Sequence, residues 1–266
     1  MLRVLGVHGA GSHRYRSRSG TADQTRATLT TQWLGHLRTT VDGRTPLDLR
    51  VAYYGDHLED GDRDAPCEDD PSFLTPGERE LLARWVTQLW PELAAAPGDE
   101  RAEQALGWLT RAFGPGTRLF GLHFCRELHT YLTATSRAAA ARQAVAAEIA
   151  EHRPDVIVAH SLGALVTYQA LWEDPGHETG LLVTLGGPLV LPGALGEHEP
   201  HGRPPSVRRW VNVADIGDIV AVPKAALADR FTGLDRDLTI NAGIWEFQTP
   251  GAYLRSPAVA RVILEG

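Results

Sequence analysis

The chain has 266 residues, a length that can bury a full hydrophobic core and is typical of one large α/β domain. Its formal net charge of -7 argues against a nucleic-acid partner, although Arg14, Arg16 and Arg18 make a short positive patch. No apolar segment approaches the roughly eighteen residues needed to cross a bilayer, so no membrane span is expected. Cys67 and Cys125 have neither metal-ligand nor redox spacing, which predicts free thiols and a cytoplasmic protein.

The amino terminus predicts a short strand that ends in a glycine-rich turn. Residues 2–7, Leu-Arg-Val-Leu-Gly-Val, are followed by His8, Gly9, Ala10 and Gly11. Glycines allow another group to approach the backbone closely, so the amide of Gly9 or Ala10 is a candidate oxyanion donor. The simpler alternative is an ordinary tight exit from a strand.

The next two segments predict a helix and a second strand. Leu29, Trp33 and Leu37 recur every four positions, which predicts a helix over residues 22–40 with one face against a sheet. Residues 47–54 alternate and are rich in strand-forming residues. A strand, a helix and a strand in this order begin a doubly wound fold.

Residues from about 55 to 132 are expected to form a helical cap inserted into this fold. Within them, residues 61–71 are acidic and rich in turn residues, and the segments 78–93 and 100–113 have helical character. The acidic run lacks ligand spacing, so we expect a solvated loop, no metal site and no cofactor. The cap is rich in aromatic residues, namely Trp85, Trp90, Trp108, Phe113, Phe120 and Phe124. These rings either dock the cap on the main domain or line an apolar substrate pocket beneath it.

Residues 156–163, Val-Ile-Val-Ala-His-Ser-Leu-Gly, are the most informative stretch of the chain. An apolar β-branched run breaks abruptly into Ser161, and the residues after it can carry an apolar helical face. Such a reversal strains and exposes the intervening side chain, and it requires small residues two positions away on each side, here Ala159 and Gly163. The pattern predicts a nucleophile elbow, with Ser161 as nucleophile and the amide of Leu162 as an oxyanion donor.

Two further strands are predicted after the elbow, at residues 181–185 and 209–214. The second strand leads into a segment with two aspartates, Asp215 and Asp218. Parallel α/β sheets place their chemistry at the carboxyl ends of the strands, so either aspartate could orient a histidine base. Together the elements predict one α/β domain over residues 1–266, with a mostly parallel, doubly wound sheet.

These motifs resemble the α/β-hydrolase superfamily, most closely its lipase-like branch of serine esterases. The resemblance covers nearly the whole chain and rests on four segments: the His8-Gly9 turn, the elbow at 159–163, the strand exit Thr184-Leu185-Gly186-Gly187-Pro188, and Asp218-Ile219-Val220 followed by Pro223. It implies an α/β-hydrolase fold with an oxyanion hole, in which Asp218 rather than Asp215 is the catalytic acid. It also implies a serine acyl hydrolase. An apolar ester or thioester is the expected substrate if the aromatic residues of the cap line a pocket.

The chain departs from this family at the catalytic base. Families of this fold follow the order serine, acid, histidine, but this chain has no histidine after His201. The late segment 245–254 resembles the family's histidine loop, in which the base often shortly precedes a tyrosine. The position expected for the base is one of four residues, none of which can take a proton from serine: Gln248, Thr249, Pro250 or Gly251. Loss of the histidine from a triad lowers kcat by a factor on the order of 10⁶.

Three functions therefore remain open, each with a small apolar molecule as the expected partner. The first is a serine acyl hydrolase that takes its base from another element. In the second, the scaffold catalyses elimination, lactonisation or cyclisation of a bulky metabolite, and the oxyanion amides act without a nucleophile. The third is a catalytically inactive binding module. Candidate bases for the first are His57, His13, His198 and His201, whereas His160 is expected to point away from the serine and to pack.

Overall fold

The computed structural model describes residues 1–12, 20–41, 45–59, 74–98, 100–196, 201–222, 227–242 and 249–265. Within these residues lies a six-stranded sheet in which all neighbouring strands are parallel. The spatial order of the strands is β2-β1-β3-β4-β5-β6. Their bounds are β1 (Leu2–Val7), β2 (Leu47–Ala52), β3 (Val156–His160), β4 (Thr179–Leu185), β5 (Val207–Asp215) and β6 (Arg236–Ile240). The doubly wound parallel α/β fold predicted from the sequence is confirmed.

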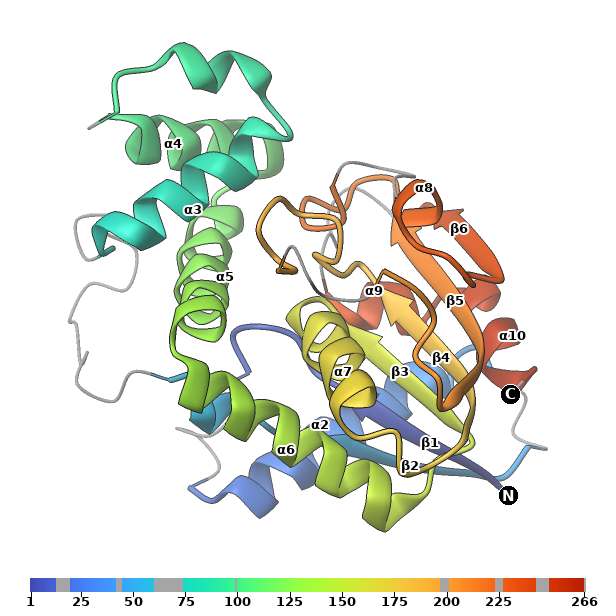
Figure 1. The fold of residues 1–266 in the computed structure, drawn as a ribbon. Coiled ribbons are helices and arrows are strands. Elements are labelled where there is room, and N and C mark those ends of the chain that lie inside the picture. The colour runs from blue at the N-terminus through green and yellow to red at the C-terminus, as the bar shows by residue number, and fades with distance from the viewer. Residues whose placement is uncertain are drawn as a thin grey trace.

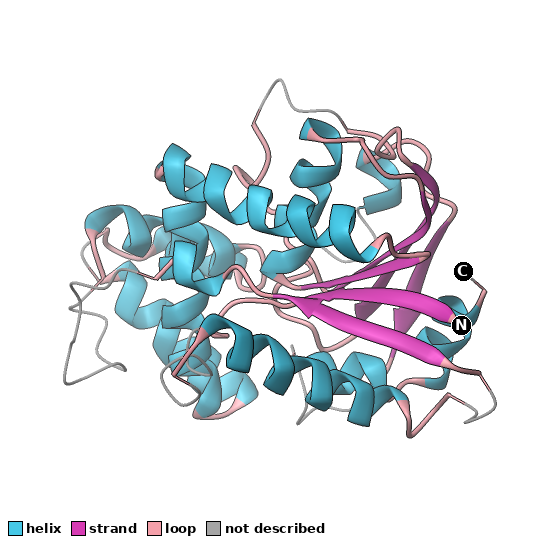
Figure 2. Ribbon diagram, turned by 90° about the horizontal axis from the view of Figure 1, so that it is seen from below, coloured by secondary structure: helices cyan, strands magenta, loops and turns pink. Residues whose placement is uncertain are grey.

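Helices cover both faces of this sheet (Figure 2). One face packs against α2 (Ala22–Leu37), α9 (Pro250–Leu254) and α10 (Pro257–Leu264). The other packs against α6 (Thr135–His152), α7 (Leu162–Glu173) and α8 (Leu227–Arg230). Val4 and Leu5 enter different core clusters because successive side chains of a strand point to opposite faces. All five residues of β3 are buried, as expected for a central parallel strand covered on both sides.

A group of helices between β2 and α6 extends beyond one end of the sheet (Figure 1). We call α3 (Pro76–Thr87), α4 (Arg101–Phe113) and α5 (Gly116–Thr133) the cap helices. Two short 3-10 segments, η1 (Gly55–His57) and η3 (Pro91–Ala95), lie in the same part of the chain. The start of α3 is fixed by a capping box, in which the side chains of Thr75 and Glu78 each accept from the backbone amide of the other.

Among the described residues, no helix is both long enough and apolar enough to cross a membrane.

Candidate active site

The strand order brings the serine and the glycine-rich turn to one place. β2 and β3 lie on opposite sides of β1, so the direction in which the sheet is wound reverses at this strand. In open parallel sheets, ligands bind outside the carboxyl ends of the strands at such a switch point. β1 ends at the His8–Gly11 turn and β3 ends at Ser161. The two elements predicted from the sequence are therefore neighbours at the switch point.

Ser161 has a backbone conformation that ordinarily belongs to glycine. Its φ is 55° and its ψ is -130°, and of the other described non-glycine residues only Arg153 has a positive φ. These angles match the first central position of a type II′ turn, where glycine dominates. The Ser161 amide donates to the carbonyl of Leu185 at 2.8 Å, and α7 begins at the next residue. The chain thus turns from strand to helix with a strained serine at the bend.

Small residues are required around this bend because two backbones meet there. A Cβ added to Gly163 would lie 2.2 Å from the carbonyl oxygen of His8. A Cβ added to Gly9 would lie 2.6 Å from Ser161 Cβ and 3.1 Å from its hydroxyl oxygen. The distances of 2.2 Å to the His8 oxygen and 2.6 Å to the Ser161 Cβ are too short for a side chain, so neither position accepts a residue other than glycine without a shift of the backbone. The glycine of the elbow and the glycine of the turn therefore allow the turn to lie directly against Ser161.

The expectation of an exposed serine is wrong. The side chain of Ser161 is only 1% exposed, and its hydroxyl has no hydrogen-bond partner among the described residues. The close approach of Gly9 explains part of this burial, since it places the backbone of the turn directly against the serine side chain. Ser161 therefore has the expected backbone strain, but its side chain is enclosed and its hydroxyl bonds to no base among the described residues. Catalytic hydrogen bonds are often absent before substrate binds.

The turn after β1 is held by His8. Its Nδ1 donates to the carbonyl of Gly9 at 2.8 Å, and its Nε2 accepts from the amide of Tyr54 at 3.2 Å, which fixes one neutral tautomer. The Gly9 carbonyl also accepts from the hydroxyl of Ser12 at 3.0 Å. In a planar trans peptide the N–H of Ala10 points away from the carbonyl of Gly9. These two bonds therefore fix the direction of the Ala10 amide.

Asp218 is held by a tyrosine. One carboxylate oxygen accepts from the amides of Val220 at 2.7 Å and Ala221 at 2.9 Å, and the other accepts from the hydroxyl of Tyr253. The same hydroxyl accepts from the amide of Asp215 at 2.9 Å. Burial, and then the charge of Asp218, raise the pKa of Tyr253 well above its usual value, so the phenol stays neutral and donates. No role for Tyr253 was predicted from the sequence. The pattern that could have indicated one is its place in segment 245–254, a few residues after the position where a histidine was expected.

The side chain of His160 packs in the interior, as expected, but it lies close to Ser161. Its ring lies against that of Tyr253, with the centroids 5.8 Å apart, and its side chain is buried. The His160 Nδ1 atom and the Ser161 hydroxyl oxygen each lie 3.1 Å from the position of an added Gly9 Cβ. The two atoms are therefore at most twice that distance apart, which one bridging water can span.

The other proposed bases are not brought to the serine by the described residues. His57 is exposed in η1, and His201 is exposed with its ring 5.3 Å from that of Phe231. Thr249, one of the residues at the position where a histidine was expected, caps α9 by accepting a hydrogen bond from the amide of Ala252. Several features discussed above lie outside the described residues: His13, Arg14, Arg16, Arg18, the acidic segment 61–71 with Cys67, His198, Pro223 and Gln248.

The cap helices are joined to the loop that carries Asp218. The indole N–H of Trp85, on α3, donates to the carbonyl of Ile219 at 2.6 Å, and both residues are fully buried. The ring of Trp85 also contacts those of Phe120 and Phe124. Trp90 and Trp108 stack on one another, with Phe113 at the edge of Trp108. The bond to Ile219 supports docking as the role of Trp85, whereas the ring contacts of the other aromatic residues lie within the cap itself.

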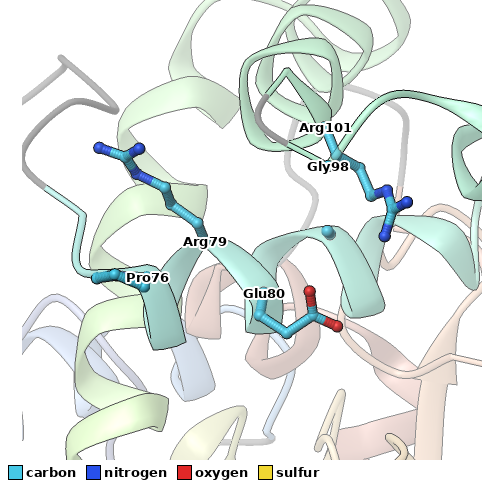
Figure 3. Close-up of a pocket in the computed structure, with 6 residues that line it drawn as sticks. Pro76, Arg79, Glu80, Gly98 and Arg101 are labelled. Atoms are coloured by element: carbon cyan, nitrogen blue, oxygen red, sulfur yellow. The ribbon is translucent and has the colours of Figure 1, made fainter.

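A hollow of about 220 Å³ lies on the outer face of α3, opposite the stripe that carries Trp85. Its lining consists of Pro76, Arg79, Glu80, Ala83, Gly98 and Arg101. Figure 3 shows Arg79 pointing away from Glu80 and Arg101, so the charged groups do not converge. This hollow is separate from Ser161.

Comparisons of the chain with protein-family models, with characterised proteins and with solved structures give no match.

Proposed function

We propose that the protein is a serine acyl hydrolase of the α/β-hydrolase type, with Ser161 as its nucleophile. The observation that carries this proposal is the backbone of Ser161, whose positive φ of 55° a serine adopts only at a cost of about 1–3 kcal/mol. Strain of this kind persists where the surrounding structure enforces it, commonly at active sites. Its position at the switch point of the sheet supports the same conclusion.

In the proposed reaction, the hydroxyl oxygen of Ser161 attacks the carbonyl carbon of an ester or thioester. The amide of Leu162, at the first position of α7, has no acceptor within the helix and is available for the negatively charged oxygen. The second donor is the amide of Ala10 or Gly9. The alcohol or thiol leaves, and water then hydrolyses the acyl-enzyme to the free acid.

His160 is our first candidate for the base, and its support is that a Cβ added to Gly9 would lie 3.1 Å both from His160 Nδ1 and from the Ser161 hydroxyl oxygen. It would take the serine proton through one water. Under this assignment Asp218 acts indirectly, because it holds Tyr253, on which the His160 ring packs. Replacement of His160 by glutamine should then abolish ester hydrolysis, whereas alanine at His57 or His201 should leave it unchanged. Loss of activity only on replacement of His13 would move the base to that residue.

The proposed substrate is a small apolar ester or thioester in the cytoplasm. Several neighbours of the site are apolar and buried, among them Leu162, Leu189 and Ile219. Cys125 is a free, buried thiol, which suits a reducing compartment.

The bond between Asp218 and Tyr253 favours a second candidate function. With the acid bound to a tyrosine, the site could stabilise an enolate or alkoxide with its amides and catalyse elimination, lactonisation or cyclisation. Ser161 would then form no covalent intermediate.

Ester turnover distinguishes these functions. We expect the wild type to hydrolyse p-nitrophenyl butyrate and Ser161→Ala to lose activity by a factor on the order of 10⁴–10⁶. Ser256→Ala is the control, because Ser256 precedes α10 and its side chain does not cap that helix. Mass spectrometry after acid quenching should detect a butyryl group on the wild type. Turnover that survives Ser161→Ala would contradict the hydrolase proposal.

A further inference from the structure

Helix α5 carries a buried carboxylate on a largely apolar face. Glu127 is only 4% exposed and lies among buried neighbours such as Phe124, Leu128 and Tyr131. Figure 1 shows α5 running from the other cap helices back to the start of α6. Burial of a carboxylate is costly unless hydrogen bonds compensate for the lost water. The partners of Glu127 therefore indicate what this residue does.

One partner of Glu127 is the glycine-rich turn. The amide of Gly11 donates to Glu127 Oε1 at 2.6 Å, although the two residues are 116 positions apart in the chain. Gly11 has a φ of 81°, a conformation that glycine adopts without strain. A charged acceptor makes such a bond about twice as strong as a neutral one. A residue of the cap helices thus binds the turn through the amide of Gly11, which follows Ala10 in the chain.

Tyr54 holds the other end of the turn. Its hydroxyl donates to the carbonyl of His8 at 2.9 Å, and its ring stacks on that of His8 with centroids 4.2 Å apart. Burial raises the pKa of Tyr54 well above its usual value, and the negative charge of Glu127 raises it further. His8 and Glu127 together hold the turn at both ends.

We propose that Glu127 is a positioning residue for the oxyanion turn, fixing the Gly11 amide from the cap so that the neighbouring Ala10 amide stays directed at the reacting oxygen. This inference rests on the proposed hydrolase function of Ser161. A donor held in place stabilises the charge that develops in the transition state and adds little to substrate binding. Loss of Glu127 should therefore lower kcat and leave KM nearly unchanged.

The test compares Glu127→Leu, which removes the acceptor, with Glu127→Gln, which keeps an oxygen for Gly11 but removes the charge. Glu80→Leu is the matched control, because Glu80 is an exposed glutamate on the cap helix α3. For Glu127→Leu we expect a fall of about 10- to 100-fold in kcat for p-nitrophenyl butyrate, less than the roughly 100- to 1,000-fold that outright loss of an oxyanion donor produces, because the Ala10 amide is misdirected and not removed. Glu127→Gln should recover most of this activity. Hydrogen exchange at the Gly11 amide should be faster in Glu127→Leu and near wild type in Glu127→Gln.

Three outcomes would overturn the inference: unchanged exchange at Gly11 in Glu127→Leu, an equal loss of kcat in both variants, or a rise in KM without a fall in kcat. A wild type without esterase activity would contradict the hydrolase function instead, and exchange at Gly11 would still show whether Glu127 holds the turn. If Glu127→Leu does not fold, Glu127→Asp replaces it, since the shorter side chain withdraws the carboxylate from Gly11. Faster exchange and lower kcat in Glu127→Asp would support the inference, and wild-type values would overturn it.

Discussion

The hydroxyl of Tyr253 donates a hydrogen bond to Asp218, the aspartate that the family resemblance favours as the acid for a histidine. The phenol also accepts from the amide of Asp215, so it joins α9 to both ends of the turn that follows β5. All three side chains are buried. A neutral tyrosine can hold the carboxylate as a histidine would, but it cannot take a proton from serine at neutral pH. The Asp218–Tyr253 pair is therefore best understood as support for the site.

Tyr253→Phe should destabilise the protein by about 2 kcal/mol, because it removes the hydroxyl that donates to the buried Asp218 carboxylate and accepts from the buried Asp215 amide. Urea denaturation measures this change. The control is Tyr53→Phe, since the hydroxyl of Tyr53 bonds to the exposed Asp56 and its loss should cost less than about 1 kcal/mol. Equal effects of the two substitutions would show that the Asp218–Tyr253 bond has no special weight.

The same tyrosine predicts a dependence of stability on alkaline pH. In the unfolded chain the phenol ionises near its ordinary pKa of 10.0, whereas in the folded protein burial and Asp218 raise that pKa. The unfolded state therefore releases its proton first, and the free energy of unfolding falls as pH rises above about 10. Denaturation between pH 9 and 11 should show a smaller fall for Tyr253→Phe than for the wild type. Parallel curves would mean that Tyr253 does not titrate differently in the two states.

Ser161→Gly should be more stable than Ser161→Ala by about 1 kcal/mol. Glycine relieves the strain at a φ of 55°, which exceeds the entropy that glycine loses on folding, whereas alanine retains the strain. Urea denaturation of the two variants gives the difference directly, and both should lack esterase activity. If Ser161→Gly is instead the less stable variant, the backbone of the elbow is not strained in solution.

Gly9→Ala should impair the site strongly, because the added methyl group would lie 2.6 Å from Ser161 Cβ and force the turn away from the serine. We expect at least about a 100-fold fall in kcat for p-nitrophenyl butyrate, comparable to the loss of one oxyanion donor. Gly35→Ala is the control: an added Cβ on Gly35 meets nothing within 4 Å, and alanine favours the helix α2. Full activity in Gly9→Ala would place the oxyanion donors elsewhere.

The central strands of the fold could be predicted from the sequence because a buried parallel strand appears as a short run of mostly apolar residues. β3 begins with a continuous apolar run and is followed by Ser161, β1 is mostly apolar and leads into a glycine-rich turn, and their predicted starts and ends agree closely with the structure. β6 was not predicted, because it is an edge strand that begins with Arg236 and Asp237 and is only half-buried. The pattern that identifies a strand is weakest where one side of the sheet ends.

The site could be predicted only in part, for a related reason. The strained bend at Ser161 depends on residues within a few positions of it, so the sequence shows it. The bonds from Tyr253 to Asp218 and from Gly11 to Glu127 join residues 35 and 116 positions apart. No local pattern records such contacts. The burial of Ser161 likewise results from the approach of Gly9 on another strand exit.

The central claim is that Ser161 is a nucleophile, and its most direct test is covalent labelling with a fluorophosphonate probe followed by peptide mapping. The account predicts one phosphonyl adduct per chain, located on Ser161, in the wild type and in Ser256→Ala. Ser161→Ala should remain unlabelled. Folded wild-type protein that stays unlabelled, or an adduct on any other residue, would contradict the account.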